Sequence, residues 1–176
     1  MELHRSERII GVNGRLVEVQ YLGVAAHEGL VRDAVLNLKY HGHRAVARQL
    51  ALVIVDALED LSMANGEWLV TWAPTSEMRR RKRGFDQSEL IARHVGAFLG
   101  QPVRRLLRRT SSQFQTGHSR IDRLNAVSFQ GRRIDSTAIL LVDDVVTTGA
   151  TFRNAAYELV RCGATKVICV APSHTL

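Results

Sequence analysis

The stretch Ile139-Leu-Leu-Val-Asp-Asp-Val-Val-Thr-Thr-Gly-Ala-Thr151 carries the strongest fold signal in this 176-residue chain. Residues 138–142 are an unbroken apolar run, which is typical of a parallel strand buried on both faces. Two carboxylates, Asp143 and Asp144, follow at the end of that strand. Beyond the loop, apolar residues recur at helical spacing over 152–160. The stretch therefore predicts a strand, a polar loop and an amphipathic helix, which is half of a βαβ unit.

The loop behind the two acids has the chemistry of a phosphate site. A helix N-terminus presents unpaired N–H groups and the positive end of the helix dipole, so it attracts anions. Adjacent acids suit hydroxyl groups, or a cation beside the phosphate. A ribose 5-phosphate has a phosphate at one end and a diol next to it, so it fits both halves. The loop adds hydroxyl donors and a glycine that lets a ligand approach the backbone: Thr147, Thr148, Gly149, Ala150 and Thr151.

This segment resembles the phosphoribosyl pyrophosphate (PRPP) binding motif of type I phosphoribosyltransferases. The likeness consists of a hydrophobic strand, two acids, two apolar residues and Thr-Thr-Gly-x-Thr, over thirteen residues. It implies that Asp143 and Asp144 hold the ribose hydroxyls and the Mg²⁺ that accompanies PRPP, and that residues 147–151 hold the 5-phosphate. Receiver domains and Walker B strands also carry acids at strand ends. A receiver has them near the start of the chain, and a Walker B strand needs a G-x-x-x-x-G-K-[ST] loop, which this chain lacks.

The remaining chain alternates between strand and helix patterns. Strands alternating with helices predict an α/β fold whose parallel sheet has helices on both faces; the resemblance makes it a type I phosphoribosyltransferase-like sheet. Residues 1–14 give no clear signal. We expect a small N-terminal cap, or hood, over residues 1–40 and a phosphoribosyltransferase-like domain over residues 41–176. Residues 16–26 are predicted to form a strand or a hairpin arm. Further strands are predicted at 68–73, 103–107 and 166–171, and helices at 28–40, 43–61 and 86–99.

Composition excludes several classes of protein. A hydrophobic fraction of 45% indicates a globular domain. No apolar run approaches the roughly 20 residues that span a bilayer, and residues 1–14 have no signal-peptide core. We therefore expect a cytoplasmic protein without membrane insertion. The two cysteines, Cys162 and Cys169, support neither a disulfide framework nor a zinc site.

Charge is unevenly distributed along the chain. The net charge is +7, but residues 79–133 hold 14 Lys or Arg against 3 Asp or Glu. The strand at 68–73 is followed by residues 74–78 and then by five consecutive cations, residues 79–83, and Gly84. Ligands of open α/β sheets lie outside the carboxyl ends of the strands, so this loop should lie beside Asp143 and Asp144. Charge-assisted contacts make a pyrophosphate a suitable ligand for Lys82, Arg83 and Gly84. A solvated basic loop, or one that contacts nucleic acid, is the alternative.

The sequence around the basic segment resembles one particular family of phosphoribosyltransferase-like proteins. Pro74 and Arg83-Gly-Phe-Asp-Gln87 resemble the Pro…Arg-Gly-Phe-Asn-Gln signature of the ComF family of phosphoribosyltransferase-like proteins. Upstream, Leu38-Lys-Tyr-His-Gly42 resembles the L-K-Y-x-G stretch of that family. There are two departures: Asp86 replaces the usual Asn, and the four-cysteine zinc module that often precedes the domain is absent.

Two downstream segments extend the likeness. Arg109-Thr-Ser-Ser-Gln113 and Arg123-Leu-Asn-Ala-Val127 resemble further parts of the ComF pattern. In type I enzymes the corresponding segment is a mobile loop that closes over PRPP and excludes water. Residues 108–127 occupy that place here, and disorder without a role is the competing reading. The candidates in this loop are Gln113, Arg123 and Asn125.

Together these resemblances imply a PRPP-binding, phosphoribosyltransferase-like protein. As an enzyme it would transfer the pentosyl group with pyrophosphate as the leaving group, and cations aimed at that group would stabilise its charge. No general base is evident, so the catalytic residue and the acceptor are left open. One alternative is a competence-type DNA-uptake accessory that binds single-stranded DNA through its basic segment. Another is a PRPP-sensing regulator without turnover. PRPP or ribose 5-phosphate is the expected ligand, and a homodimer is compatible with the sequence.

Overall fold

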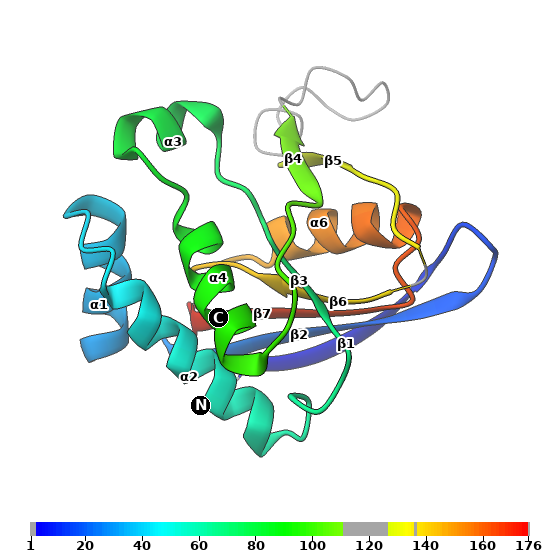
Figure 1. The fold of residues 1–176 in the computed structure, drawn as a ribbon, viewed down its shortest axis with the longest axis horizontal. Helices are drawn as coiled ribbons and strands as arrows, with labels where there is room; N and C mark the ends of the chain where they lie inside the picture. Colours follow the sequence, from blue (N-terminus) through cyan, green and yellow to red (C-terminus); the bar gives the residue numbers. More distant parts are fainter. Residues whose placement is uncertain (1–2, 111–126, 136, 176) are drawn as a thin grey trace.

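The computed structural model describes residues 3–110, 127–135 and 137–175, and that part of the chain is an α/β fold with a mixed five-stranded sheet (Figure 1). The strand order is β1-β2-β7-β6-β3. Strands β2, β7, β6 and β3 run parallel, whereas β1 is antiparallel to β2. The strand bounds are Leu3–Ile10 for β1, Leu16–Ala26 for β2, Leu69–Trp72 for β3, Ala138–Val142 for β6 and Lys166–His174 for β7.

The expected all-parallel sheet is wrong at β1. Only residues 11–15 separate β1 from β2, and a parallel pair needs a crossover of about a dozen residues or more. A connection this short joins antiparallel neighbours. β1 was missed because it is an exposed edge strand with many polar side chains, so it lacks the apolar run that marks a buried strand. β2 pairs with β7 inside the central sheet, and the separate 1–40 cap stays a prediction.

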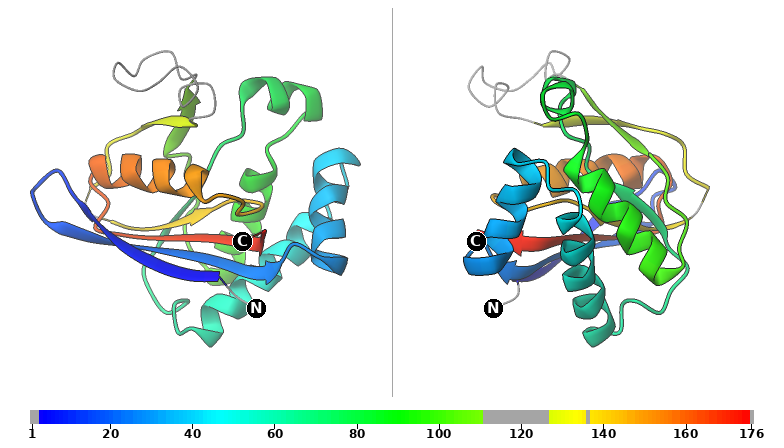
Figure 2. Two further views of the ribbon diagram at one scale, coloured as in Figure 1. Left: turned by 180° about the vertical axis from the view of Figure 1, so that it is seen from behind. Right: turned by 60° about the vertical axis from the view of Figure 1, so that its left-hand side comes forward.

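Helices cover both faces of the sheet (Figure 2). α1, α2 and α4 pack on the face to which Leu140 and Val142 point, and α6 packs on the opposite face, with Ile139 and Leu141. Successive side chains of a strand point to opposite faces, so a strand covered on both sides is apolar throughout. The described helices are α1 (Gly29–Tyr40), α2 (Val46–Asp60), α3 (Glu77–Arg83), α4 (Gln87–Leu99) and α6 (Ala150–Arg161).

The predicted strand at 103–107 is also wrong. Val103 makes only an isolated parallel bridge to Val70, which covers the outer edge of β3. The buried side chains of Leu106 and Leu107 then join the core on the α6 side instead of continuing along β3. The chain there forms a two-stranded antiparallel sheet of β4 (Leu107–Thr110) and β5 (Ser128–Gly131).

The basic segment expected as a loop contains helix α3, which stands clear of the central sheet in Figure 1. The Ser76 hydroxyl accepts a hydrogen bond from the Arg79 N–H at 3.3 Å and so caps the helix start. Gly84, with φ of +77°, ends the helix and donates its N–H to the Arg80 carbonyl at 2.8 Å. No helix in the described part of the chain is long and apolar enough to cross a membrane.

Candidate functional site

A polar cleft of about 370 Å³ lies at the carboxyl ends of β3 and β6. Four segments that are distant in sequence line it: the end of α1, the β3–α4 connection with α3, β4, and the loop after β6. This is the edge at which open α/β sheets bind ligands. The cleft therefore brings the two sequence-predicted constellations, the acid pair and the basic segment, into one site.

The floor of the cleft is acidic. The Ser88 hydroxyl donates to Oδ1 of Asp143 at 2.7 Å, and the Asp144 N–H donates to the same oxygen at 2.9 Å. Nζ of Lys39 lies 3.0 Å from Oδ1 of Asp144, and the two side chains are 18% and 13% exposed. Desolvation, and then the neighbouring Asp144 carboxylate, raise the pKa of Asp143 from 3.8 to about 7. Lys39 thus pairs directly with Asp144, whereas Asp143 is hydrogen-bonded to neutral donors and feels the Lys39 charge from a greater distance.

The rim of the cleft is basic. Arg79 and Arg83 are four residues apart on α3, so they share one face of the helix, and both line the cleft. Nη1 of Arg83 donates to Oε1 of Gln87 at 2.9 Å. Arg109 reaches the cleft from β4. Burial, and then the charge of Arg79, lower the pKa of the Arg109 guanidinium, so the two cations lie close enough to repel each other.

The predicted phosphate loop divides between two cavities. Thr147 and Thr151 line the cleft. Thr148 and Gly149 line a smaller neighbouring pocket of about 90 Å³, together with two cations, Arg5 and Arg153. Gly149, with φ of +76°, is the N-cap of α6, and the helix begins at Ala150, which is exposed. The N-terminus of α6 follows the acid pair in the chain, as the sequence predicted.

The candidates for pyrophosphate are only partly brought to the cleft. Arg83 lines the cleft and Lys82 does not. The second cation of α3 that lines the cleft is Arg79. The N–H of Gly84 donates to the Arg80 carbonyl, so this group caps the C-terminal end of α3 and is not free for a pyrophosphate. Three further candidates, Gln113, Arg123 and Asn125, lie outside the described residues.

Sequence reasoning missed several groups in the cleft. Lys39 and Tyr40 belong to the L-K-Y-x-G stretch, and Gly42 just beyond them marks the helix end that points to the site. Gln87 and Ser88 open α4 directly after its N-cap, Asp86. Asp86 also accepts the Thr75 N–H at 2.9 Å, so its carboxylate ties the basic segment to α4.

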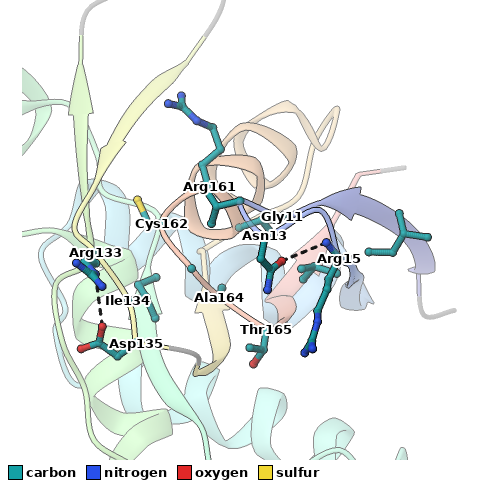
Figure 3. Close-up of a pocket in the computed structure, with 15 residues that line it drawn as sticks. Gly11, Asn13, Arg15, Arg133, Ile134, Asp135, Arg161, Cys162, Ala164 and Thr165 are labelled. Atoms are coloured by element: carbon teal, nitrogen blue, oxygen red, sulfur yellow. Dashed lines mark hydrogen bonds and ion pairs between the residues drawn. The ribbon is translucent and has the colours of Figure 1, made fainter.

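A larger cavity, about 940 Å³, lies at the opposite end of the sheet, between the β1–β2 turn and the end of α6 (Figure 3). Its arginines, Arg15, Arg133 and Arg161, point in different directions, and Arg133 is paired with Asp135 at 3.6 Å. These side chains do not converge on one ligand. We therefore place the candidate site in the smaller cleft.

The carboxylates of the floor are suitable ligands for Mg²⁺. Hard cations of this kind take oxygen ligands, often one or two carboxylates together with phosphates and water. In the described part of the chain, no group of three or more His, Cys, Asp or Glu side chains forms a dedicated metal cluster. Asp143 and Asp144 would hold such an ion only together with oxygens of the ligand, and Lys39 would compete with it for Asp144.

These features define a class of protein: an α/β protein with a cleft of acidic floor and basic rim at the carboxyl edge of its sheet. Among known proteins, the chain is similar to DNA utilization protein YhgH of Escherichia coli K12, with 27% identity over 128 residues. The alignment covers 70% of this chain and 56% of the relative, so the chain spans little more than half the length of that protein. No protein-family model matches the chain.

Proposed function

We propose that the cleft binds a phosphorylated ribose, either PRPP or ribose 5-phosphate with Mg²⁺, in a phosphoribosyltransferase-like domain of type I fold that resembles the ComF family. The observation that carries this proposal is the juxtaposition around one cavity. Asp143 and Asp144 form its floor, and Thr147 and Thr151 border it. The cationic wall comes from Arg79 and Arg83 on α3 and from Arg109 on β4.

Each part of the cleft has a chemical task in this proposal. The carboxylates of the floor accept hydrogen bonds from the ribose hydroxyls. The threonine hydroxyls and the N-terminus of α6 hold the 5-phosphate. The guanidinium groups of Arg79, Arg83 and Arg109 contact the pyrophosphate by charge-assisted bonds and stabilise it as it leaves. Mg²⁺, when bound, neutralises phosphate charge. A sensor without turnover uses the same contacts, and incubation of PRPP with a panel of nitrogen bases separates it from a transferase by release of pyrophosphate.

Calorimetry with ribose 5-phosphate and PRPP measures binding to the cleft directly. Asp144→Asn should weaken both ligands by about 1.5–3 kcal/mol, because a charged hydrogen bond is lost. Thr151→Val should weaken both by about 0.5–1.5 kcal/mol through one neutral bond. Thr165→Val, in the larger cavity at the other end of the sheet, is the matched control. Equal affinities in all four proteins would remove the site.

A second candidate function is single-stranded DNA binding by a DNA-uptake accessory. The similarity to the E. coli DNA utilization protein supports it. So do cations outside the cleft: Arg80, Arg81 and Lys82 on α3 are exposed, and Arg105, Arg108 and Arg132 border a depression on the β4–β5 sheet. Fluorescence anisotropy with oligo(dT) should show affinity falling with salt, with a log–log slope of about −0.7 per phosphate neutralised. Absence of binding at low salt, or a flat salt response, would contradict this function.

A further inference from the structure

Ser88 carries a buried hydroxyl that connects one wall of the cleft to its acidic floor. It is the second residue of α4, it lines the cleft, and it is only 4% exposed. Its hydroxyl donates to Oδ1 of Asp143 at 2.7 Å, and the two residues are 55 positions apart in the chain. This hydrogen bond therefore joins the start of α4 to the loop after β6 inside the cleft itself.

Helix α4 does not use the Ser88 hydroxyl to begin. Its N-cap is Asp86, whose carboxylate accepts the Thr75 N–H at 2.9 Å and the Glu89 N–H at 3.4 Å. Serine hydroxyls near helix starts commonly bond to the backbone of their own segment. The Ser88 hydroxyl instead donates across the cleft to a side chain of another element, so its task is at Asp143.

The hydrogen bonds to Asp143 fix the orientation of its carboxylate. The Asp144 N–H donates to the same oxygen, Oδ1, at 2.9 Å. Two donors on Oδ1 hold the carboxylate in one rotation, and Oδ2 is then the oxygen that a ligand meets. A group that is ordered before the ligand arrives loses less conformational entropy on binding. A site built to bond a hydroxyl also rejects an analogue without it, because the polar group of the site is left unpaired.

We infer that Ser88 is a positioning residue that makes the cleft selective for ribose over deoxyribose: its hydroxyl holds Oδ1 of Asp143, so that Oδ2 accepts a hydrogen bond from one hydroxyl of the sugar. Ser88 itself does not touch the ligand in this arrangement. A neutral donor suits the task, because a cation at this position would compete with the sugar for the carboxylate. The inference rests on the proposed ribose-phosphate function and names the group that sets its sugar specificity.

Calorimetry with ribose 5-phosphate and its 2-deoxy and 3-deoxy analogues tests this role. Wild type should bind ribose 5-phosphate about 10- to 150-fold more tightly than the analogue without the hydroxyl held by Asp143, the range for one hydrogen bond to a charged group. Ser88→Ala should reduce this ratio about 2- to 12-fold and leave the affinity for that analogue nearly unchanged. Ser88→Thr keeps the hydroxyl and should keep the ratio. Ser62→Ala, exposed in the turn after α2, is the matched control.

The ratio of the two affinities separates positioning from a contact that only stabilises the fold. If Ser88→Ala weakens ribose 5-phosphate and both deoxy analogues equally, or changes none of them, Ser88 has no part in sugar selectivity. The inference is then overturned while the proposed ribose-phosphate function stands. If the methyl group of Thr prevents folding, Ser88→Cys, a weaker donor, should give a ratio between those of wild type and Ser88→Ala. If wild type binds none of the three sugar phosphates, the proposed function fails and the inference falls with it.

Discussion

Asp143 and Asp144 are adjacent carboxylates whose charges are compensated in different ways. Asp144 has the ammonium of Lys39 at 3.0 Å. Asp143 accepts hydrogen bonds from the Ser88 hydroxyl and a backbone N–H, and burial and then the Asp144 charge raise its pKa to about 7, although the more distant charge of Lys39 acts in the opposite direction. A partly buried carboxylate whose charge is incompletely compensated destabilises the fold when it ionises. We therefore expect ionised Asp143, which the ribose ligand requires, to lower the free energy of unfolding of the protein without ligand.

Replacing Asp143 by Asn should stabilise the protein at neutral and alkaline pH. The pKa of Asp143 is higher in the folded state than its ordinary 3.8, so the folded protein holds the proton more tightly. The stability that this proton contributes is present at low pH and is lost as pH rises through about 4 to 7. Urea unfolding should find Asp143→Asn more stable than wild type by about 1–3 kcal/mol at pH 8, and nearly equal at pH 4.

The exposed Asp135 offers a matched control for that change. Its side chain is 94% exposed, so Asp135→Asn should leave the pH dependence of unfolding as in the wild type. A lower stability of Asp143→Asn than of wild type at pH 8 would mean that Lys39 and the hydrogen bonds to Asp143 outweigh its burial and the repulsion from Asp144, which contradicts the raised pKa.

Lys39 should act as a built-in substitute for a divalent cation. Lys39→Met leaves two adjacent carboxylates without a positive charge, and loss of this half-buried partner should lower the free energy of unfolding by about 1–3 kcal/mol. Mg²⁺ should then raise the melting temperature of Lys39→Met more than that of the wild type. Differential scanning calorimetry with and without Mg²⁺ measures this. Lys82→Met, on the exposed side of α3, is the control, and an equal Mg²⁺ response in all three proteins would contradict the competition.

The sequence is sufficient for the part of the site that is contiguous. The acids and the threonine loop follow one strand directly, so a single motif predicts them. Lys39, Arg79 and Arg109 come from three other segments, and only the folded chain brings them to the same cleft. Arg109 was recognised as part of a family pattern, but its proximity to Arg79 is a property of the β4–β5 pair, which the strand pattern did not predict.

At the scale of elements, α3 turns a run of five cations into two surfaces. A helix places residues four apart on the same face, so Arg79 and Arg83 meet at the cleft while Arg80, Arg81 and Lys82 point elsewhere. The signals for this helix were present in Ser76 and Gly84 at its ends. They were overlooked because a seven-residue helix without buried residues has no apolar periodicity.

Two double variants of α3 with equal loss of charge should separate its surfaces. Arg79→Ala with Arg83→Ala should weaken PRPP about 10- to 100-fold, because charge-assisted contacts to the pyrophosphate are lost. Arg80→Ala with Lys82→Ala should leave PRPP affinity nearly unchanged, since exposed charges contribute little at physiological salt. The second pair should instead reduce the salt slope of oligo(dT) binding by about 1.4, for two phosphates. The opposite pattern would reverse the assignment of the two faces.

At the scale of the whole molecule, the mixed sheet makes the N-terminal segment part of the core. β2 lies beside β7 over the registered pairs from Glu18 to Ala26, and its Val19 and Leu22 are at most 1% exposed. Alternation of strands and helices predicted the α/β layers correctly. It did not predict β1, because an exposed edge strand carries polar side chains and lacks the apolar run that marks a buried strand.

Deletion of residues 1–40 tests whether that segment is a separate cap. We expect a chain of residues 41–176 to lose cooperative unfolding, because β7 would lose its neighbour and apolar surface of both cores would meet water. Deletion of residues 1–10 alone removes only the edge strand and should preserve a cooperative transition. Urea titration followed by tryptophan fluorescence at Trp68 and Trp72 measures both. A cooperative transition in the 41–176 chain would support the predicted boundary at residue 40.

A crystal structure with ribose 5-phosphate and Mg²⁺ is the decisive test of the proposed ribose-phosphate binding site in the cleft. We expect phosphate oxygens within hydrogen-bonding distance of the 147–151 loop and ribose hydroxyls against Asp143 and Asp144. We also expect Lys39 to move away from Asp144 if the cation takes its place. Ribose 5-phosphate bound instead in the large cavity near Arg161, or on the outer face of α3, with the cleft filled by water, would contradict it.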